Sequence, residues 1–232
     1  MARSDDRPYL LACVATAMIV AFALSAEAAT FTVDTTDDLP DINAGNGKCS
    51  TAFIFGKCSL RAAIMEANRN TSGARHTVRI PAGTYTLDRD EQPGASGEEF
   101  GALNIFSGMI IAGDGGNAVI RGKSGWADRI FNIANAVNVS MSHLDIGNGR
   151  PADGRSGGAI RIASFSAFVT LTNVIVRDSS APDAGGGGIS SNGTLVLDGC
   201  AVRNNSAETA GGGIESFGSA GRREYRVQWE HC

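Results

Sequence analysis

The side chains of this chain that could support metal or acid-base chemistry are few and scattered. A metal site needs several Cys or His side chains at ligand spacing. The three histidines, His76, His143 and His231, lie far apart along the chain. From the sequence we therefore assign no metal ligand, no catalytic residue and no cofactor.

Cys49 and Cys58 offer the clearest covalent chemistry. They are nine residues apart in a loop rich in Gly and Asn. Nearby cysteines usually form a disulfide in an oxidising compartment, and a small covalent ring would restrain an otherwise loose loop. We therefore predict a Cys49–Cys58 disulfide.

The elements that must position the other polar residues form a repeat. The segments Val139–Ile146, Val169–Val176 and Leu195–Val202 align at offsets of 30 and 26 residues, with apolar residues at relative positions 1, 3, 6 and 8. This spacing is typical of two short alternating strands with a corner between them. Glycine-rich turns, such as Gly185–Gly188 and Gly211–Gly213, separate the copies and suit tight corners.

A repeat of this length cannot bury its apolar side chains alone, so the copies must stack into a solenoid. Each coil of the solenoid contains only about 26 residues, which leaves no room for a helix in each repeat. The composition, with 30 Gly and 6% aromatic residues, also suits short strands. The segments Thr77–Leu87 and Leu103–Ile120 also alternate and are interpreted as earlier, less regular rungs. We therefore predict an all-β fold, a right-handed parallel β-helix (a pectate-lyase-like solenoid), over residues 71–220.

Stacking assigns each repeat position to a column that faces the core or the solvent. Leu144, Val174 and Cys200 share an inward column, so Cys200 is interpreted as a buried small hydrophobe rather than a reactive thiol. Glycoside hydrolysis requires two neighbouring carboxylates, and the outward columns do not place two carboxylates together.

Arg177 and Arg203 occupy one outward column in neighbouring rungs, about 4.8 Å apart by strand spacing. Like charges this close repel one another unless something anionic lies between them. Two interpretations remain open: Asp178 or other nearby acids neutralise the arginines, or an anionic glycan binds them. Arg177 and Arg203 are therefore candidate glycan-binding residues. The next column, Asn148, Asp178 and Asn204, is interpreted as a hydrogen-bonding ladder.

Residues 58–68 form the strongly helical stretch that follows the leader. Ser59 can cap the first turn, and Leu60, Ala63, Ile64 and Ala67 make a narrow apolar stripe. An open β-helix end exposes core and strand edges. We therefore predict that residues 29–70 form an N-terminal cap, with a short amphipathic helix as its lid.

The sequence resembles a family of secreted proteins that carry an N-terminal C-S-L-R-E-A (CSLREA) motif before right-handed β-helix repeats. Here the motif is Cys58–Ile64 and reads Cys-Ser-Leu-Arg-Ala-Ala-Ile, with Ala62 where the family has Glu. The lead-in Phe31–Asp34, the upstream Cys49 and the Gly-Gly-x-Ile repeats also fit. The repeats are similar to those of polymorphic outer-membrane proteins. The resemblance implies the fold and export, and the substitution at Ala62 removes any polar contact that the Glu would make.

Residues 1–28 have the pattern of a signal peptide. Basic residues precede the apolar run Tyr9–Leu24, and Ala26–Ala28 is an A-x-A cleavage site. The run has 16 residues, fewer than the roughly 20 that span a bilayer. We expect membrane contact only through export, and a secreted, extracellular or outer-membrane-surface location. A net charge of −4 without a basic block argues against a nucleic-acid partner.

Two functional hypotheses follow. The first is an exported, non-catalytic surface or extracellular β-helix protein, adhesive or glycan-binding, with polysaccharide or cell-surface components as partners. The alternative is a fragment of a polysaccharide lyase or glycoside hydrolase of the β-helix type, although the Gly-His-Gly and Arg-Ile-Lys motifs of polygalacturonases are absent.

Residues 221–232 break the repeat pattern and are interpreted as an aberrant or truncated tail. An uncapped solenoid end presents unpaired backbone groups above an apolar core, and open strand edges pair with other chains. We therefore expect end-to-end self-association.

Overall fold

The computed structural model describes residues 27–69, 73–92, 97–152, 154–218 and 220–222. Residues 1–26 and 223–232, which include nearly all of the expected signal peptide and most of the expected tail, lie outside the described residues, as does His231.

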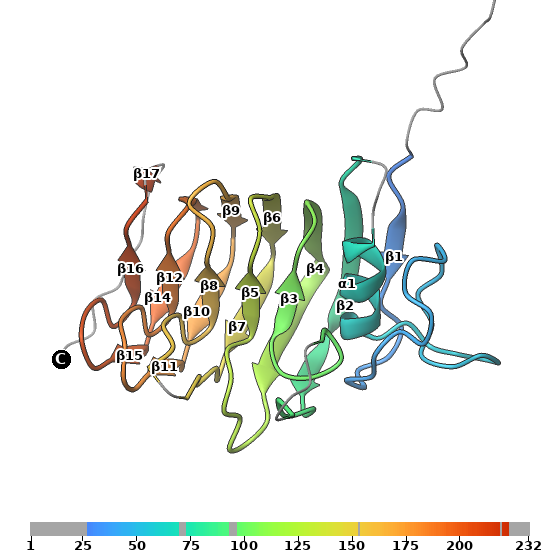
Figure 1. Ribbon diagram of the computed structural model, residues 1–232, viewed down its shortest axis with the longest axis horizontal. Helices are drawn as coiled ribbons and strands as arrows, with labels where there is room; N and C mark the ends of the chain where they lie inside the picture. The colour runs from blue at the N-terminus through green and yellow to red at the C-terminus, as the bar shows by residue number, and fades with distance from the viewer. Residues whose placement is uncertain (1–26, 70–72, 93–96, 153, 219, 223–232) are drawn as a thin grey trace, which may run out of the picture.

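The described chain is a parallel β-solenoid with one short helix at its N-terminal end (Figure 1). This confirms the all-β, parallel β-helix fold with a short N-terminal helix. The elements are β1 (Thr30–Thr32), α1 (Leu60–Asn68), β2 (His76–Leu87), β3 (Leu103–Ile105), β4 (Met109–Gly122), β5 (Phe131–Ile133), β6 (Asn138–Ser142), β7 (Leu144–Gly147), β8 (Ile160–Ile162), β9 (Phe168–Thr172), β10 (Ile175–Arg177), β11 (Ser180–Ala181), β12 (Ile189–Ser191), β13 (Thr194–Asp198), β14 (Ala201–Arg203), β15 (Ser206–Ala207), β16 (Ile214–Ser216) and β17 (Ala220–Arg222).

Each strand pairs in parallel with its equivalent in the next rung. One sheet has the order β14-β10-β7-β4-β6-β9-β13-β17, with β2 and β1 joined through β4, and a second sheet has the order β16-β12-β8-β5-β3. The long strand β4 bends between two faces, because its first half pairs with β6 and its second half with β7. The strands β6, β9 and β13 form what we call the first face, and β7, β10 and β14 form the second face.

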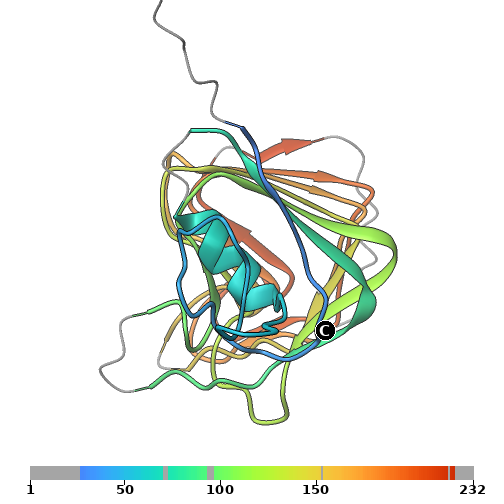
Figure 2. The ribbon, with the colours of Figure 1, turned by 90° about the vertical axis from the view of Figure 1, so that its right-hand side faces the viewer.

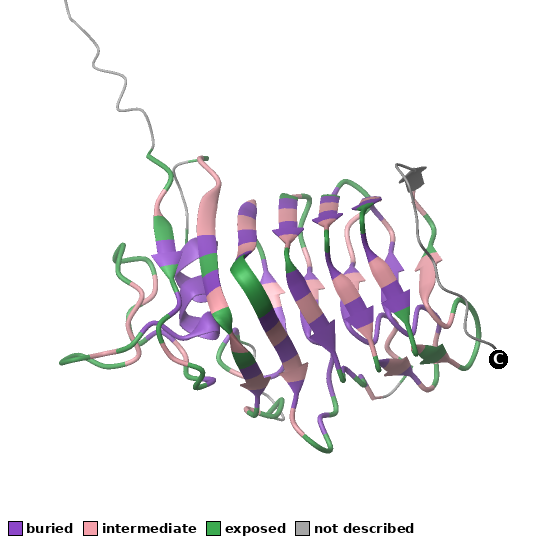
Figure 3. Ribbon diagram, turned by 180° about the vertical axis from the view of Figure 1, so that it is seen from behind, coloured by how far each residue is buried: buried purple, intermediate pink, exposed green. Residues whose placement is uncertain are grey.

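The inward columns of the repeat make the core, as predicted. Val139 pairs with Val169 and Val169 with Leu195, and all three are buried. The pairs that stack Ile146 on Val176 and Val176 on Val202 make an equivalent column on the second face. Figure 3 shows the result as alternating buried and partly exposed bands along the strands.

The corners between faces use left-handed backbone conformations. His143, Asn173 and Gly199 occupy the first corner of successive rungs with φ of 55°, 54° and 61°. Glycine adopts this region at little steric cost, and Asn and His enter it more often than most residues. At Gly199 a Cβ would lie 2.4 Å from Oδ1 of Asn173, so a side chain there would require the Asn173 amide of the preceding rung to move.

The helix α1 covers the N-terminal end of the coil (Figure 2). Ser59 is its N-cap, as predicted, and accepts a hydrogen bond at Oγ from the amide of Ala62 at 3.0 Å. The polar side of this amphipathic helix is buried as well as its apolar stripe, so all nine residues of α1 are buried. The reason is that the preceding loop folds over the outer side of the helix, where the amides of Gly45 and Gly47 donate to the Glu66 carboxylate.

Arg61 is the polar centre of this cap. It is 1% exposed, and its guanidinium contacts both carboxylate oxygens of Asp38 at 2.7 and 3.0 Å. It also donates to the carbonyl oxygens of Glu98 at 2.9 Å and Gly101 at 2.8 Å. One side chain therefore joins the helix, the N-terminal segment and the loop that leads into the second sheet.

The other end of the described solenoid extends slightly beyond the predicted limit at residue 220. Strand β17 pairs with β13, and its last residue, Arg222, stands opposite Leu197. Parallel pairing depends on backbone groups alone, so it continues for two residues after the apolar pattern has ended.

Because Arg61 is buried and Arg79 is exposed, we predict that replacing Arg61 lowers the free energy of unfolding much more than replacing Arg79 does. Arg61→Met leaves the buried Asp38 carboxylate without its cation, which we expect to lower the free energy of unfolding by about 3 kcal/mol or more. Arg79→Met is the matched control, because Arg79 pairs with Asp114 in solvent, with both side chains about half exposed, and should leave the unfolding midpoint nearly unchanged. Urea unfolding followed by circular dichroism measures both, and equal midpoints would contradict the assignment.

The crowded glycines predict a second difference, between the melting temperatures of two Gly→Ala variants. A Cβ on Gly187 would lie 2.1 Å from the Ser206 carbonyl oxygen, so Gly187→Ala should displace the backbone and lower the melting temperature sharply. Gly83→Ala is the control, since its Cβ would meet the Tyr85 ring at an ordinary 3.6 Å. Thermal melting and exported yield compare the two variants, and a Gly187→Ala protein as stable as Gly83→Ala would show that the corner can relax.

Candidate functional site

The strand register places Arg177 and Arg203 in one column, as predicted. Strand β10 pairs with β7 and β14, so Gly147, Arg177 and Arg203 stack at one position on the second face. Gly147 leaves room for Arg177, because a Cβ there would lie 3.6 Å from Cγ of Arg177 and 2.5 Å from its carbonyl oxygen.

Arg177 is neutralised by carboxylates of the protein itself. Its Nε donates to both oxygens of Asp145 at 2.9 and 3.2 Å, its Nη2 donates to Asp145 at 3.1 Å, and its Nη1 donates to Asp178. The hydrogen bond with Asp145 raises the pKa of the guanidinium, and burial only partly opposes this. Of the two interpretations of the column, these contacts favour neutralisation by nearby acids at Arg177. Arg203 is exposed and makes no ion pair within the described part of the chain.

An open groove of about 310 Å³ lies beside Asp145 at the first corner. His143 and Asn173 follow one another at this corner, with His143 Nε2 and Asn173 Nδ2 3.4 Å apart. The residues that line the groove are Gly115, Gly116, Asn117, His143, Leu144, Asp145, Asn173 and Ile175. This groove was not predicted from the sequence, although relative position 5 of the repeat, with His, Asn and Gly in turn, marked the left-handed corner.

The predicted ladder at the next corner is present in part. Asn148, Asp178 and Asn204 all have positive φ, between 53° and 58°. Asn204 Nδ2 donates to Asp178 Oδ1 at 3.3 Å, whereas Asn148 Nδ2 donates to the carbonyl oxygen of Gly122 at 2.6 Å. These side chains stabilise the corner through hydrogen bonds between rungs.

The acidic loop that follows β2 is held by ion pairs. Asp90 pairs with Lys123, and Glu91 with Arg155 at 2.9 Å. Glu98 is buried and pairs with Arg69 at 2.6 Å, beside a second groove of about 550 Å³. Within the residues that the structure describes, no group of three or more His, Cys, Asp or Glu side chains could hold a metal ion.

A further carboxylate, Asp128, is held inside a buried corner. It accepts hydrogen bonds from the amides of Ala102 and Arg129, both at 2.8 Å. Burial lowers the pKa of the Arg129 guanidinium to about 10, and the Asp128 charge partly opposes this effect. The arrangement positions backbone between β4 and β5, and both oxygens of Asp128 have donors.

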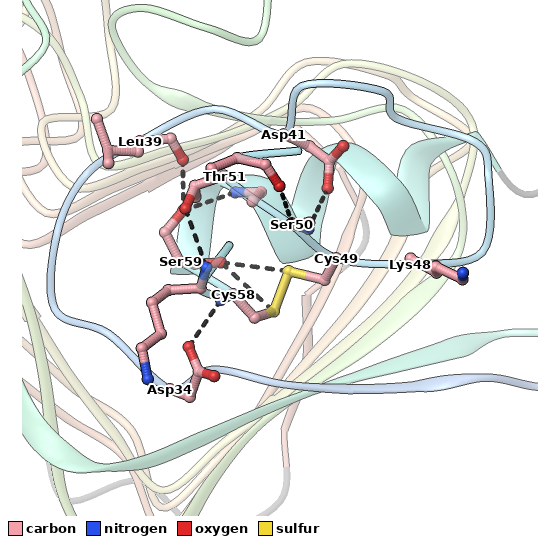
Figure 4. The surroundings of a disulfide bond; sticks show 12 residues. Asp34, Leu39, Asp41, Lys48, Cys49, Ser50, Thr51, Cys58 and Ser59 are labelled. Carbon is pink, nitrogen blue, oxygen red and sulfur yellow. Dashed lines mark hydrogen bonds between the residues drawn. A yellow bond between two sulfur atoms is a disulfide. The ribbon is translucent and has the colours of Figure 1, made fainter. Parts of the chain in front are cut away.

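The predicted disulfide between Cys49 and Cys58 is confirmed, with an S–S distance of 2.02 Å (Figure 4). Asp34 and Asp41 hold the two sides of its ring: the amide of Cys58 donates to Asp34 Oδ1, and the amide of Ser50 donates to Asp41 Oδ2, both at 2.7 Å. The disulfide therefore closes the ring, and hydrogen bonds hold it to the segment that follows β1 and to the cap.

Cys200 is a free, buried thiol, as the column predicts. Burial raises its pKa, and backbone hydrogen bonds offset this only in part. The thiol form is therefore favoured, which is unsuited to nucleophilic chemistry.

No protein-family model, curated protein or solved structure matches this chain. The resemblance to CSLREA-motif proteins therefore stays a prediction that rests on the motif and the repeats. In the part of the chain that the structure describes, the single helix α1 is too short to cross a membrane.

Removal of the disulfide should destabilise the cap. We expect Cys49→Ser with Cys58→Ser to lower the free energy of unfolding by about 2–3 kcal/mol, because the ring no longer restrains the unfolded chain. Cys200→Val is the control, since valine already fills the same column at Val174, and it should be close to neutral. Thermal unfolding ranks the three proteins, and mass mapping of the unreduced chain that found Cys200 in a disulfide would contradict the assignment.

Proposed function

We propose that this protein is an exported, non-catalytic β-helix protein that acts at a surface or outside the cell and binds glycans through its first corner. The disulfide supports export, because such bonds persist in oxidising compartments. The leader pattern and the CSLREA resemblance point the same way.

The observation that carries the proposal is the chemistry of the corner groove. His143 and Asn173 offer hydrogen-bonding ring and amide groups, which suit the hydroxyl groups of a sugar. Asp145, the carboxylate of this groove, accepts hydrogen bonds from the Arg177 guanidinium and is held as a counterion. A general acid or base must be able to exchange its proton with substrate, and this pairing opposes that role.

Arg203 extends the proposed surface toward anionic glycans. It lies on the same face as the groove, one rung beyond Arg177, and its guanidinium is exposed. Arg177 contributes by holding Asp145 rather than by contacting the ligand. The solenoid thus supplies a rigid strip of corner and strand positions along which a polymer can lie.

Binding and turnover measured on the same panel of neutral and acidic polysaccharides test the proposal. We expect the wild-type chain to bind at least one polysaccharide and to release neither reducing ends nor unsaturated products. His143→Gly with Asn173→Gly should abolish binding and preserve the fold, because Gly199 shows that glycine is accommodated at this corner. Arg203→Gln should weaken binding to acidic polymers alone.

Asp145→Asn separates the role of Arg177 from that of Arg203. It removes one of the two carboxylates that neutralise Arg177 and leaves only Asp178, so binding to acidic polymers should increase. Turnover by the wild type would favour the polysaccharide-lyase or hydrolase alternative, and binding that persists in the double glycine variant would place the ligand elsewhere.

A further inference from the structure

The loop inside the disulfide ring exposes three consecutive apolar side chains at the N-terminal end of the solenoid. Phe53, Ile54 and Phe55 are 91%, 74% and 98% exposed. The loop extends beyond α1 and β1 in Figure 1, and Figure 3 shows its outer part as exposed. Single exposed apolar residues are common, but three in succession indicate a binding surface.

The segment that presents these side chains is held in place. The Cys49–Cys58 disulfide closes its base, the amide of Thr51 donates to the Lys57 carbonyl oxygen at 2.8 Å, and the Lys57 amide donates to Thr51 Oγ1 at 3.2 Å. Phe55 has a φ of 54°, which is strained for a bulky side chain. Such strain persists where surrounding structure enforces it and is frequent at binding sites. The Phe53–Phe55 tip is therefore presented to solvent by a braced loop.

The charge of this loop identifies the chemistry of its partner. Residues 42–58 contain Lys48 and Lys57 and no Asp or Glu, whereas the whole chain has a net charge of −4. Both lysines are exposed and lie on either side of the apolar tip in the sequence. An apolar tip flanked by lysines fits a bilayer interface, where side chains such as Phe enter the acyl boundary and lysines meet anionic headgroups.

We propose that the Phe53–Phe55 tip inserts into the interface of an anionic membrane and anchors the N-terminal end of the solenoid to it. The anchor would hold the solenoid by one end, and it adds a membrane contact to the one expected during export. This inference does not depend on glycan binding at the first corner.

Sedimentation with lipid vesicles tests the proposal. The proteins are exported and oxidised chains whose N-terminus is determined by mass spectrometry, because the apolar run Tyr9–Leu24 would itself bind lipid. We expect the wild type to co-sediment with vesicles of phosphatidylcholine and phosphatidylglycerol. Replacement of Phe53, Ile54 and Phe55 by Ser should weaken partitioning about tenfold or more. Phe165→Ser, which removes another exposed aromatic side chain, is the matched control and should bind as the wild type does.

Two further measurements separate insertion of the tip from adsorption of the chain to the headgroups. Lys48→Gln and Lys57→Gln should each weaken binding to anionic vesicles about fivefold, with little effect on pure phosphatidylcholine. Phe53→Trp should add an emission that shifts to the blue with vesicles and is quenched by brominated lipid, measured against the wild type, in which Trp126 and Trp229 supply the background.

The outcomes that overturn the proposal are distinct. Wild-type protein that stays in the supernatant excludes a membrane anchor, as does a triple-serine variant that binds unchanged. A wild-type oligomer that becomes monomeric in the triple-serine variant, without lipid, would assign the tip to contact between copies of this chain. Circular dichroism and the intact disulfide verify that each variant is folded.

Discussion

In-register parallel hydrogen bonding between successive rungs is the constraint on which the rest of this structure depends. It stacks each residue on its repeat equivalent, about 4.8 Å away, so the side chains of a column must tolerate one another. Apolar columns satisfy this condition easily and become the core. The charged column satisfies it only because Arg177 turns to Asp145, a residue of the preceding rung in a neighbouring column.

The corners are where this regular pattern permits chemical variety. A left-handed position accepts Asn, His, Asp or Gly, so the same backbone can carry an amide, an imidazole, a carboxylate or no side chain. The first corner changes from His143 to Asn173 to Gly199 without a change in its geometry. The groove at that corner consequently has a polar character that the strands, with their alternating apolar positions, do not offer.

Features that repeat or lie close together in the sequence could be predicted from it. The inward column of Cys200, the disulfide, the Ser59 cap and the Arg177–Arg203 register all follow from periodicity or short spacing. The burial of Arg61 could not be predicted, because its partner Asp38 lies in an aperiodic segment. The Asp145 contact was missed for a related reason: columns specify what lies above and below a residue, but not the diagonal direction in which a long side chain extends.

Cys200 offers a chemical probe of local opening along the solenoid. The second-face core column is fully buried at Ile146 and Val176 but 7% exposed at Val202, and Cys200 in the same rung is 8% exposed. Within the described residues, β14 ends its path through the sheet, and fraying begins where neighbours are fewest. A thiol reacts only when reagent reaches it, so its alkylation rate counts the openings of that rung. The alkylation of this one buried thiol would therefore measure how often the end of the described solenoid opens.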